Sequence, residues 1–286
     1  MAQTYCKNGD SLFLSGQKPA RIFPSFLKLH IHNMGDSRED FPIFKILSLR
    51  NLSYLLTQKH LFLDRIIEAW EDPYELFFLK EDFWSKSNNC SIGMDSPISG
   101  TFGQSWSLQD ESDAMWRIYS TKASIAPGIP DIYSGIRIQT SFQKILNALY
   151  YDDDCMGDTW LGNVEYGTES QMIEFIKEET KVDSFSIWRD LMPYTMFIKR
   201  SEFSHEKEFR VIKLLDSSTD SKYNDIKRIA IAIEPDSFID SYMLDPRLSQ
   251  QETDILVDKL VKLGADRLKI KRSELYDFKR IRIELD

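Results

Sequence analysis

The stretch that most constrains the fold is Phe203-Ser204-His205-Glu206-Lys207-Glu208-Phe209-Arg210-Val211-Ile212. Its second half mixes charged and apolar residues as the opening of a β-strand does. Alternate residues of a strand share one face, so Glu206, Glu208 and Arg210 are expected to point the same way. Arg210 is then placed to keep Glu208 ionised, while the like charge of the two glutamates raises one of their pKa values. The same string also fits an exposed strand with surface salt bridges.

Other strands and helices are expected around this stretch. Phe209–Leu215 and Ile226–Ile233 are separated by a polar segment and predict a hairpin. Further strands are expected at 102–108 and 135–140, and amphipathic helices at 142–149 and 250–263. This order predicts an α+β fold: a central, mostly antiparallel sheet with flanking helices and a cleft between its halves. We expect residues 1–40 to form an N-terminal extension and 41–286 to form a single domain.

A second chemistry-bearing segment is Phe102-Gly103-Gln104-Ser105-Trp106-Ser107. In a strand, Ser105 and Ser107 share one face and Trp106 takes the other. Hydroxyl side chains that face a cleft can hydrogen-bond a nucleotide. A half-buried strand with two solvent-facing serines is the plain structural alternative.

Three further candidates come from short patterns. Trp116 and Tyr119 lie three residues apart in an expected helix and therefore share one side of it, as core or as part of a site. Lys45, on the first strand of the body, is a candidate cation for a phosphate, or a surface lysine. Asp72 and Glu75 have the spacing of a helix cap.

Composition limits the classes of function. Hydrophobic residues make up 42% of the 286 residues and charged residues 28%, so the chain can bury a core. The net charge of −9 disfavours passive binding to nucleic acid. Three scattered cysteines form no metal-binding pair, so we expect no metal, and they suit the cytoplasm. No apolar run is long enough for a membrane span.

The acidic residues Asp152, Asp153 and Asp154 suggest a third class of function, a nuclease with a bound metal. Glycine-rich phosphate loops, the H-E-x-x-H motif and the G-x-S-x-G motif are all missing from the sequence.

Taken in order, these segments resemble a bacterial family catalogued as domain of unknown function 2971. The resemblance covers roughly residues 41–277 and is carried by short motifs: Phe44-Lys45-Ile46, Trp70 to Glu75, Ser105-Trp106-Ser107, Met115-Trp116-x-x-Tyr119, Gly135 to Ile138, Phe203 to Arg210 and the tail from Ile233 to Tyr276. The resemblance implies an association with phage defence but no settled reaction.

The order of three motifs is also similar to that of ADP-ribosyltransferases of the Arg-Ser-Glu type. That likeness implies NAD as the substrate, Glu208 as the catalytic carboxylate and Glu206 as the residue that orients the acceptor. It places Ser105 or Ser107 at the nicotinamide side and Lys45 at the pyrophosphate, where that class has arginine. An arginine fork binds phosphate differently from a lysine ammonium, so this position departs from the pattern.

Two main hypotheses about function follow. The first is an NAD-consuming ADP-ribosyltransferase that acts as a defence effector or toxin on a protein or nucleic-acid acceptor. The second is a non-catalytic sensor or partner-binding module of a defence system, in which Glu206, Glu208 and Arg210 form a structural ion network.

Overall fold

The structure is a computed structural model. It describes residues 3–5, 28–32, 40–70, 72, 74–76, 83–85, 89–92, 100–125, 127–128, 130–150, 157–179, 193–215, 225–278 and 282. The chain divides into two compact units, each assembled from three separate segments. The first unit comprises Met1–Ile43, Leu61–Gln109 and Ser141–Ala232, and the second comprises Phe44–His60, Asp110–Thr140 and Ile233–Asp286. The single domain expected over 41–286 stays a prediction.

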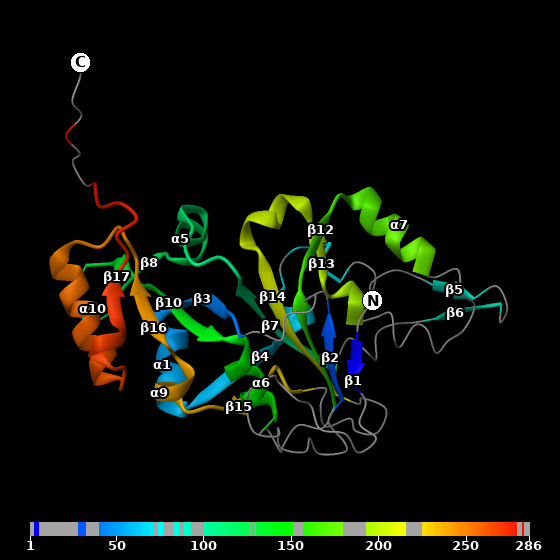
Figure 1. The fold of residues 1–286 in the computed structure, drawn as a ribbon, viewed down its shortest axis with the longest axis horizontal. Coiled ribbons are helices and arrows are strands. Elements are labelled where there is room, and N and C mark those ends of the chain that lie inside the picture. The colour runs from blue at the N-terminus through cyan, green and yellow to red at the C-terminus, as the bar shows by residue number, and fades with distance from the viewer. Residues whose placement is uncertain are drawn as a thin grey trace. The chain divides into compact units, whose positions relative to one another are not determined.

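The first unit holds a mostly antiparallel sheet, as the sequence predicts (Figure 1). Its strands lie in the order β1-β2-β11-β14-β7, and β4 pairs with both β7 and β15. Of these pairs, β2 with β11 is parallel, whereas β1–β2, β11–β14, β7–β14 and β4–β7 are antiparallel. The strand bounds are β1 Gln3–Tyr5, β2 Lys28–His32, β4 His60–Arg65, β7 Thr101–Ser107, β11 Asp158–Asn163, β14 Glu208–Leu214 and β15 Arg228–Ala232.

Strand β14 lies between β11 and β7, and every residue from Glu208 to Lys213 is buried. This burial excludes the exposed, salt-bridged strand that the sequence also allowed. The predicted hairpin of β14 with β15 is wrong, because both edges of β14 are already paired. Strand β15 instead pairs with β4, where the backbone N–H of Arg65 donates to the carbonyl of Lys227 at 2.8 Å.

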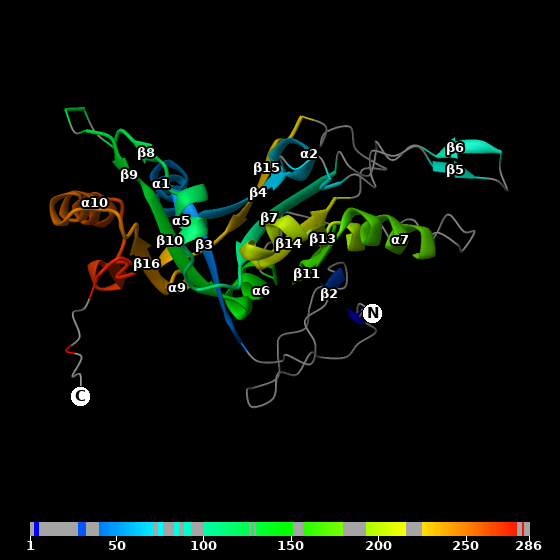
Figure 2. The ribbon, with the colours of Figure 1, turned by 90° about the horizontal axis from the view of Figure 1, so that it is seen from above.

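Helices and short strands complete the first unit (Figure 2). Helix α7 lies beside β12 and β13, which pair in parallel. Phe41, Phe142 and Phe209 form one aromatic group in the core, with ring centroids 5.2–6.0 Å apart. The remaining bounds are α2 Ile66–Ala69, β5 Phe83–Ser85, β6 Cys90–Ile92, α6 Phe142–Tyr150, β12 Glu165–Gly167, α7 Glu169–Glu179, β13 Ile198–Arg200 and the 3-10 helix η1 Ser201–Glu206.

The second unit carries the strand order β3-β10-β16-β17. Strands β10 and β16 are antiparallel, and β16 and β17 are parallel. Residues 268–270 divide between the 3-10 helix η3 and β17. The bounds are β3 Pro42–Ser48, α1 Leu49–Gln58, α5 Asp113–Tyr119, β8 Lys122–Ala123, β9 Ile132–Tyr133, β10 Gly135–Ser141, α9 Pro235–Phe238, β16 Ser241–Leu244, α10 Gln250–Lys262, η3 Arg267–Lys269 and β17 Ile270–Arg272.

Local sequence signals explain where the helices of the second unit begin and end. Ser48 caps α1 by accepting the backbone N–H of Asn51 at 3.2 Å, and Ser249 forms a capping box with Glu252 on α10. Gly264 follows α10 with φ +101°, a left-handed conformation that glycine adopts without strain.

In the part of the chain that the structure describes, no helix combines the length and the apolar character needed to cross a bilayer.

Candidate functional site

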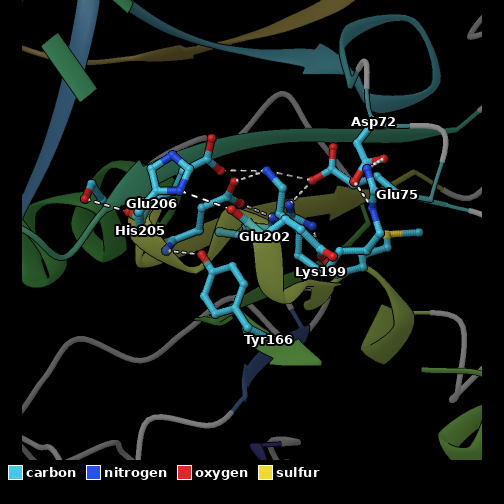
Figure 3. Close-up of polar contacts among 12 residues, drawn as sticks. Asp72, Glu75, Tyr166, Lys199, Glu202, His205 and Glu206 are labelled. Atoms are coloured by element: carbon cyan, nitrogen blue, oxygen red, sulfur yellow. Dashed lines mark hydrogen bonds and ion pairs between the residues drawn. The ribbon is translucent and has the colours of Figure 1, made fainter. Parts of the chain in front are cut away.

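The sequence stretch around Glu208 lies in a cluster of buried charges in the first unit (Figure 3). Strand β14 supplies Glu208 and Arg210, and η1 ends on Glu206. Lys199 comes from β13, and Glu75 from the turn at 74–76. All five side chains are buried, with relative exposures of 1–8%. We call these five residues the charge cluster.

Lys199 connects the three carboxylates of the charge cluster. Its ammonium nitrogen lies 2.6 Å from Oε2 of Glu206, 2.7 Å from Oε1 of Glu208 and 3.3 Å from Oε1 of Glu75. Arg210 makes the second set of contacts. Its Nε lies 2.5 Å from Oε2 of Glu208, and its Nη2 pairs with Glu75. Both oxygens of Glu208 are therefore bound by cations.

The pKa values of the two neighbouring glutamates are shifted in opposite directions. Burial alone would raise the pKa of Glu208, but Arg210, a hydrogen bond from Glu206 and Lys199 together hold this pKa well below its ordinary value. The pKa of Glu206 is raised, first by burial and then by its hydrogen bond with Glu208. A pair with pKa values pushed apart in this way is typical of acid/base sites, although structural ion networks also produce it.

Arg210 is held rigidly from several sides. Its Nη1 donates to the carbonyl of Met196 at 2.6 Å, and its guanidinium carbon lies 4.1 Å from the centre of the Trp70 ring. Burial would lower the pKa of Arg210, but the charges of Glu208 and Glu75 raise it. Arg210 thus stays a cation that orients Glu208.

The backbone turn between η1 and β14 brings Glu206 and Glu208 to the same side. Lys207 adopts a left-handed conformation with φ 43°, and the strand begins at Glu208, one residue before the expected start at Phe209. Both glutamates still reach the Lys199 ammonium, as the predicted shared face requires. The hydroxyl of Tyr166 accepts the backbone N–H of Glu208 at 2.8 Å and anchors the start of the strand.

The serine strand lies directly beside this site. In the β7–β14 register Ser107 is opposite Glu208, Trp106 is opposite Phe209 and Ser105 is opposite Arg210. Directly opposite residues of paired strands lie on the same face, so both serines share the face of the charge cluster. Ser107 donates its hydroxyl to the carbonyl of Glu206 at 2.8 Å. Trp106, on the other face, is 2% exposed and belongs to the core.

A half-exposed arginine borders the charge cluster. Arg200 binds Asp72 through Nε at 3.2 Å and Nη2 at 2.8 Å, and its guanidinium lies 4.5 Å and 5.3 Å from the ring centres of Tyr74 and Phe203. The hydrogen bond with Asp72 raises the pKa of Arg200. This arrangement fixes the turn that carries Glu75.

Three of the predicted site residues belong to the second unit. Lys45 is half-buried on β3. Trp116, on α5, is 1% exposed and donates its indole N–H to Glu111 at 2.9 Å, which is a core arrangement. Tyr119 is 44% exposed on the same helix. Trp116 is therefore buried in the core and Tyr119 is exposed to solvent, although both lie on the same helix.

Sequence reasoning missed Lys199 and misread Glu75. The Glu75 half of the expected helix cap is wrong, because Glu75 points into the charge cluster. Asp72 pairs with Arg200 and also accepts the backbone N–H of Tyr74 at 3.1 Å, as a cap does. The available signal for Lys199 was weak: one lysine in Phe197-Ile198-Lys199-Arg200, a few residues before the glutamates.

No metal centre is evident among the residues that the structure describes, where no group of His, Cys, Asp and Glu is placed to hold an ion. Within the charge cluster, the Lys199 ammonium occupies the position between the three carboxylates. The acidic segment of Asp152, Asp153 and Asp154 lies outside the described residues.

Comparisons with known proteins give two distant structural likenesses. The chain is similar to DarT of Thermus sp. 2.9 in complex with NAD+, with a TM-score of 0.36 and 12% identity over 82% of this chain and 95% of that one. It is also similar to the same protein in complex with ADP-ribosylated ssDNA, with a TM-score of 0.34 and 11% identity over 82% and 94%. At these scores and identities the likenesses carry no argument about activity.

No family model matches the sequence, and no curated protein matches it. The resemblance to the family of domain of unknown function 2971 therefore stays a prediction.

Proposed function

We propose that this chain is an ADP-ribosyltransferase that uses NAD as its substrate and Glu208 as its catalytic carboxylate. The observation that carries the proposal is the pairing of an ionised Glu208 with a Glu206 whose pKa is raised, at the start of a strand that lies beside Ser107. Enzymes that cleave glycosidic bonds commonly use two carboxyl groups, one protonated and one ionised.

The reaction breaks the bond between the ribose C1′ and the nicotinamide nitrogen of NAD. It forms a bond from C1′ to a nucleophilic atom of the acceptor, and nicotinamide and a proton leave. Positive charge develops on the ribose in the transition state, and a fixed carboxylate stabilises that charge. Glu208 suits this role because its lowered pKa keeps it ionised throughout the neutral range.

The other residues have supporting roles in this proposal. Glu206 orients the acceptor. Ser105 or Ser107 supports the nicotinamide side. The acceptor is a protein or a nucleic acid, and the biological setting is defence against phage.

The test is release of nicotinamide from NAD by the purified chain and by its Glu208→Gln variant. We expect the variant to lose at least about a hundredfold in rate, the usual cost of removing one preorganised charge-stabilising group. Glu234→Gln is the matched control, because Glu234 is an exposed glutamate that pairs with Lys59 on the surface. An unreactive wild-type chain, or a Glu208→Gln variant with full activity and intact circular dichroism, would refute the proposal.

A second function is favoured by one specific observation: both oxygens of Glu208 are bound to cations, and its side chain is 7% exposed. In this alternative the chain is a non-catalytic sensor or partner-binding module, and the charge cluster is a structural ion network. Breaking a buried ion pair costs about 3–5 kcal/mol. The alternative therefore predicts a Glu208→Gln variant that loses this stability in urea unfolding, while the wild-type chain leaves NAD intact.

A further inference from the structure

Lys199 has an arrangement that the proposed reaction does not explain. Its side chain is 8% exposed, and its ammonium contacts Glu75, Glu206 and Glu208 together. A lysine ammonium has three N–H donors around one nitrogen, whereas the arginine guanidinium is a planar fork. The Lys199 ammonium donates hydrogen bonds to Glu206, on a 3-10 helix, and to Glu208, on a strand, and it forms an ion pair with Glu75, on a turn.

Counting charges shows what Lys199 does for the charge cluster. The three carboxylates Glu75, Glu206 and Glu208 face two cations, Lys199 and Arg210. An uncompensated buried charge is very unfavourable. One proton on a carboxyl group makes the cluster neutral, and Glu206 is the group with the raised pKa.

Among the residues that the structure describes, the surroundings of the cluster add few other charges. From β12, the neutral Tyr166 hydroxyl faces Glu208, and burial raises the pKa of that hydroxyl to about 12. From η1, His205 lies against the carbonyl of Glu202, and from the loop before β13 the carbonyl of Met196 accepts from Arg210. Arg200, on β13, is paired with Asp72. The count of two cations and three carboxylates therefore describes the interior of the cluster.

We propose that Lys199 is a positioning residue that keeps Glu208 an anion facing Arg210 and leaves the single proton of the cluster on Glu206. This inference deepens the proposed function and rests on it for its consequence in catalysis. If Lys199 became neutral, the cluster would contain three carboxylates and one cation, and it would take up a second proton. That proton would compete for Glu208 and remove the charge that faces the ribose.

The test is a charge cycle of four proteins: wild type, Lys199→Met, Glu75→Gln and the double variant. Infrared absorption counts the protonated carboxyl groups at neutral pH, and Glu206→Gln identifies the wild-type band. We expect one protonated group in the wild type, two in Lys199→Met, none in Glu75→Gln and one again in the double variant. The double variant is decisive, because it removes one cation and one carboxylate and so restores the original balance.

The same four proteins give a catalytic readout through the pH dependence of kcat/KM for NAD cleavage. In Lys199→Met the acid limb should move to higher pH by about one unit or more, since a neighbouring opposite charge shifts a pKa by 1–3 units. In the double variant the limb should return toward the wild-type position. A merely structural lysine would lower the rate at every pH and leave the limb in place.

Several results would overturn the proposal. The first is a Lys199→Met variant with only one protonated carboxyl group. The second is a double variant whose number of protonated carboxyl groups differs from one. The third is an acid limb of kcat/KM that stays at the wild-type pH in Lys199→Met. If Lys199→Met does not fold, Glu75→Gln decides the question, because retention of its protonated carboxyl contradicts the charge count. The exposed pair of Lys59 and Glu234 gives the control cycle, in which no protonation change is expected. Absence of NAD cleavage in the wild type defeats the proposed function, and the infrared cycle still tests Lys199.

Discussion

At the scale of single residues, the titrating proton of Glu206, whose pKa is raised, makes stability depend on pH. The pKa of Glu206 lies above its ordinary value of 4.5, because of burial and the hydrogen bond with Glu208. Above pH 4.5 the unfolded chain releases this proton while the folded chain keeps it. The free energy of unfolding therefore falls as the pH rises from 4.5 to the folded pKa, by at most about 1.4 kcal/mol per unit.

The Glu206→Gln variant isolates this contribution, because glutamine has nearly the same shape and does not titrate. We expect the stability of the wild type relative to Glu206→Gln to decrease as the pH rises above 4.5. Urea unfolding of both proteins across the acidic and neutral range measures the difference. A difference that stays constant with pH would show that Glu206 has the same pKa in the folded and unfolded chains.

The site was predictable from sequence where its contacts are local. Glu208 and Arg210 are two residues apart on a strand, so their contact follows from strand geometry. No local sequence pattern predicts that Lys199 and Glu75 belong to the charge cluster. Glu75 lies 135 residues before Arg210, and its spacing from Asp72 imitates a helix cap. Contacts between distant segments depend on tertiary packing, which periodicity does not encode.

At the scale of elements, β7 and β14 approach closely at Gly103. A Cβ atom there would lie 2.9 Å from Cδ1 of Ile212, 2.9 Å from Cγ2 of Ile66 and 3.2 Å from the carbonyl oxygen of Val211. We predict that Gly103→Ala lowers the free energy of unfolding by about 1–3 kcal/mol, the typical cost of overpacking. Urea unfolding measures this loss.

Gly167 on β12 provides the control for Gly103. A Cβ at Gly167 meets only atoms of Gln171, at 3.5 Å, which is ordinary contact. Gly167→Ala is therefore expected to keep or slightly raise stability. Equal effects of the two substitutions would mean that the close packing of β7 against β14 does not limit stability.

Element types were easier to predict than their pairing. The strand at Thr101–Ser107 follows from composition, and the helix at Gln250–Lys262 follows from an amphipathic pattern that stops at Gly264. The prediction of a hairpin between β14 and β15 was wrong, because a polar segment between two strands does not prevent either of them from pairing with other strands. Strand β15 pairs with β4 instead, and next to this pair the side chain of Arg65 donates a hydrogen bond to the carbonyl of Ile226, 161 residues away.

At the scale of the whole molecule, each unit is assembled from three segments that alternate along the chain. Sequence reasoning gave one continuous body from residue 41 to 286, since composition changes little along the chain and nothing marks the crossings. The sheet class was predictable because it follows from the number and spacing of strands. The alternation of the two units along the chain was not predictable, because it depends on which strands pair with one another.

The distance along the chain between Glu75 and its partners has a kinetic consequence. Lys199 is only 7 residues from Glu206 and 9 from Glu208, whereas Glu75 is 135 residues from Arg210. Closing a long loop costs more entropy than closing a short one, so the Glu75 contacts are expected to form after the folding transition state. We predict that Glu75→Gln speeds unfolding, about tenfold for each 1.4 kcal/mol of stability lost, and leaves the folding rate unchanged.

Stopped-flow folding and unfolding in urea separate the two rates, and a folding rate that falls in step with stability would contradict this order of events. A side chain whose contacts form after the transition state affects the unfolding rate more than the folding rate. Glu75 would then set how long a folded molecule persists under heat or protease, while the speed of folding is decided elsewhere in the chain.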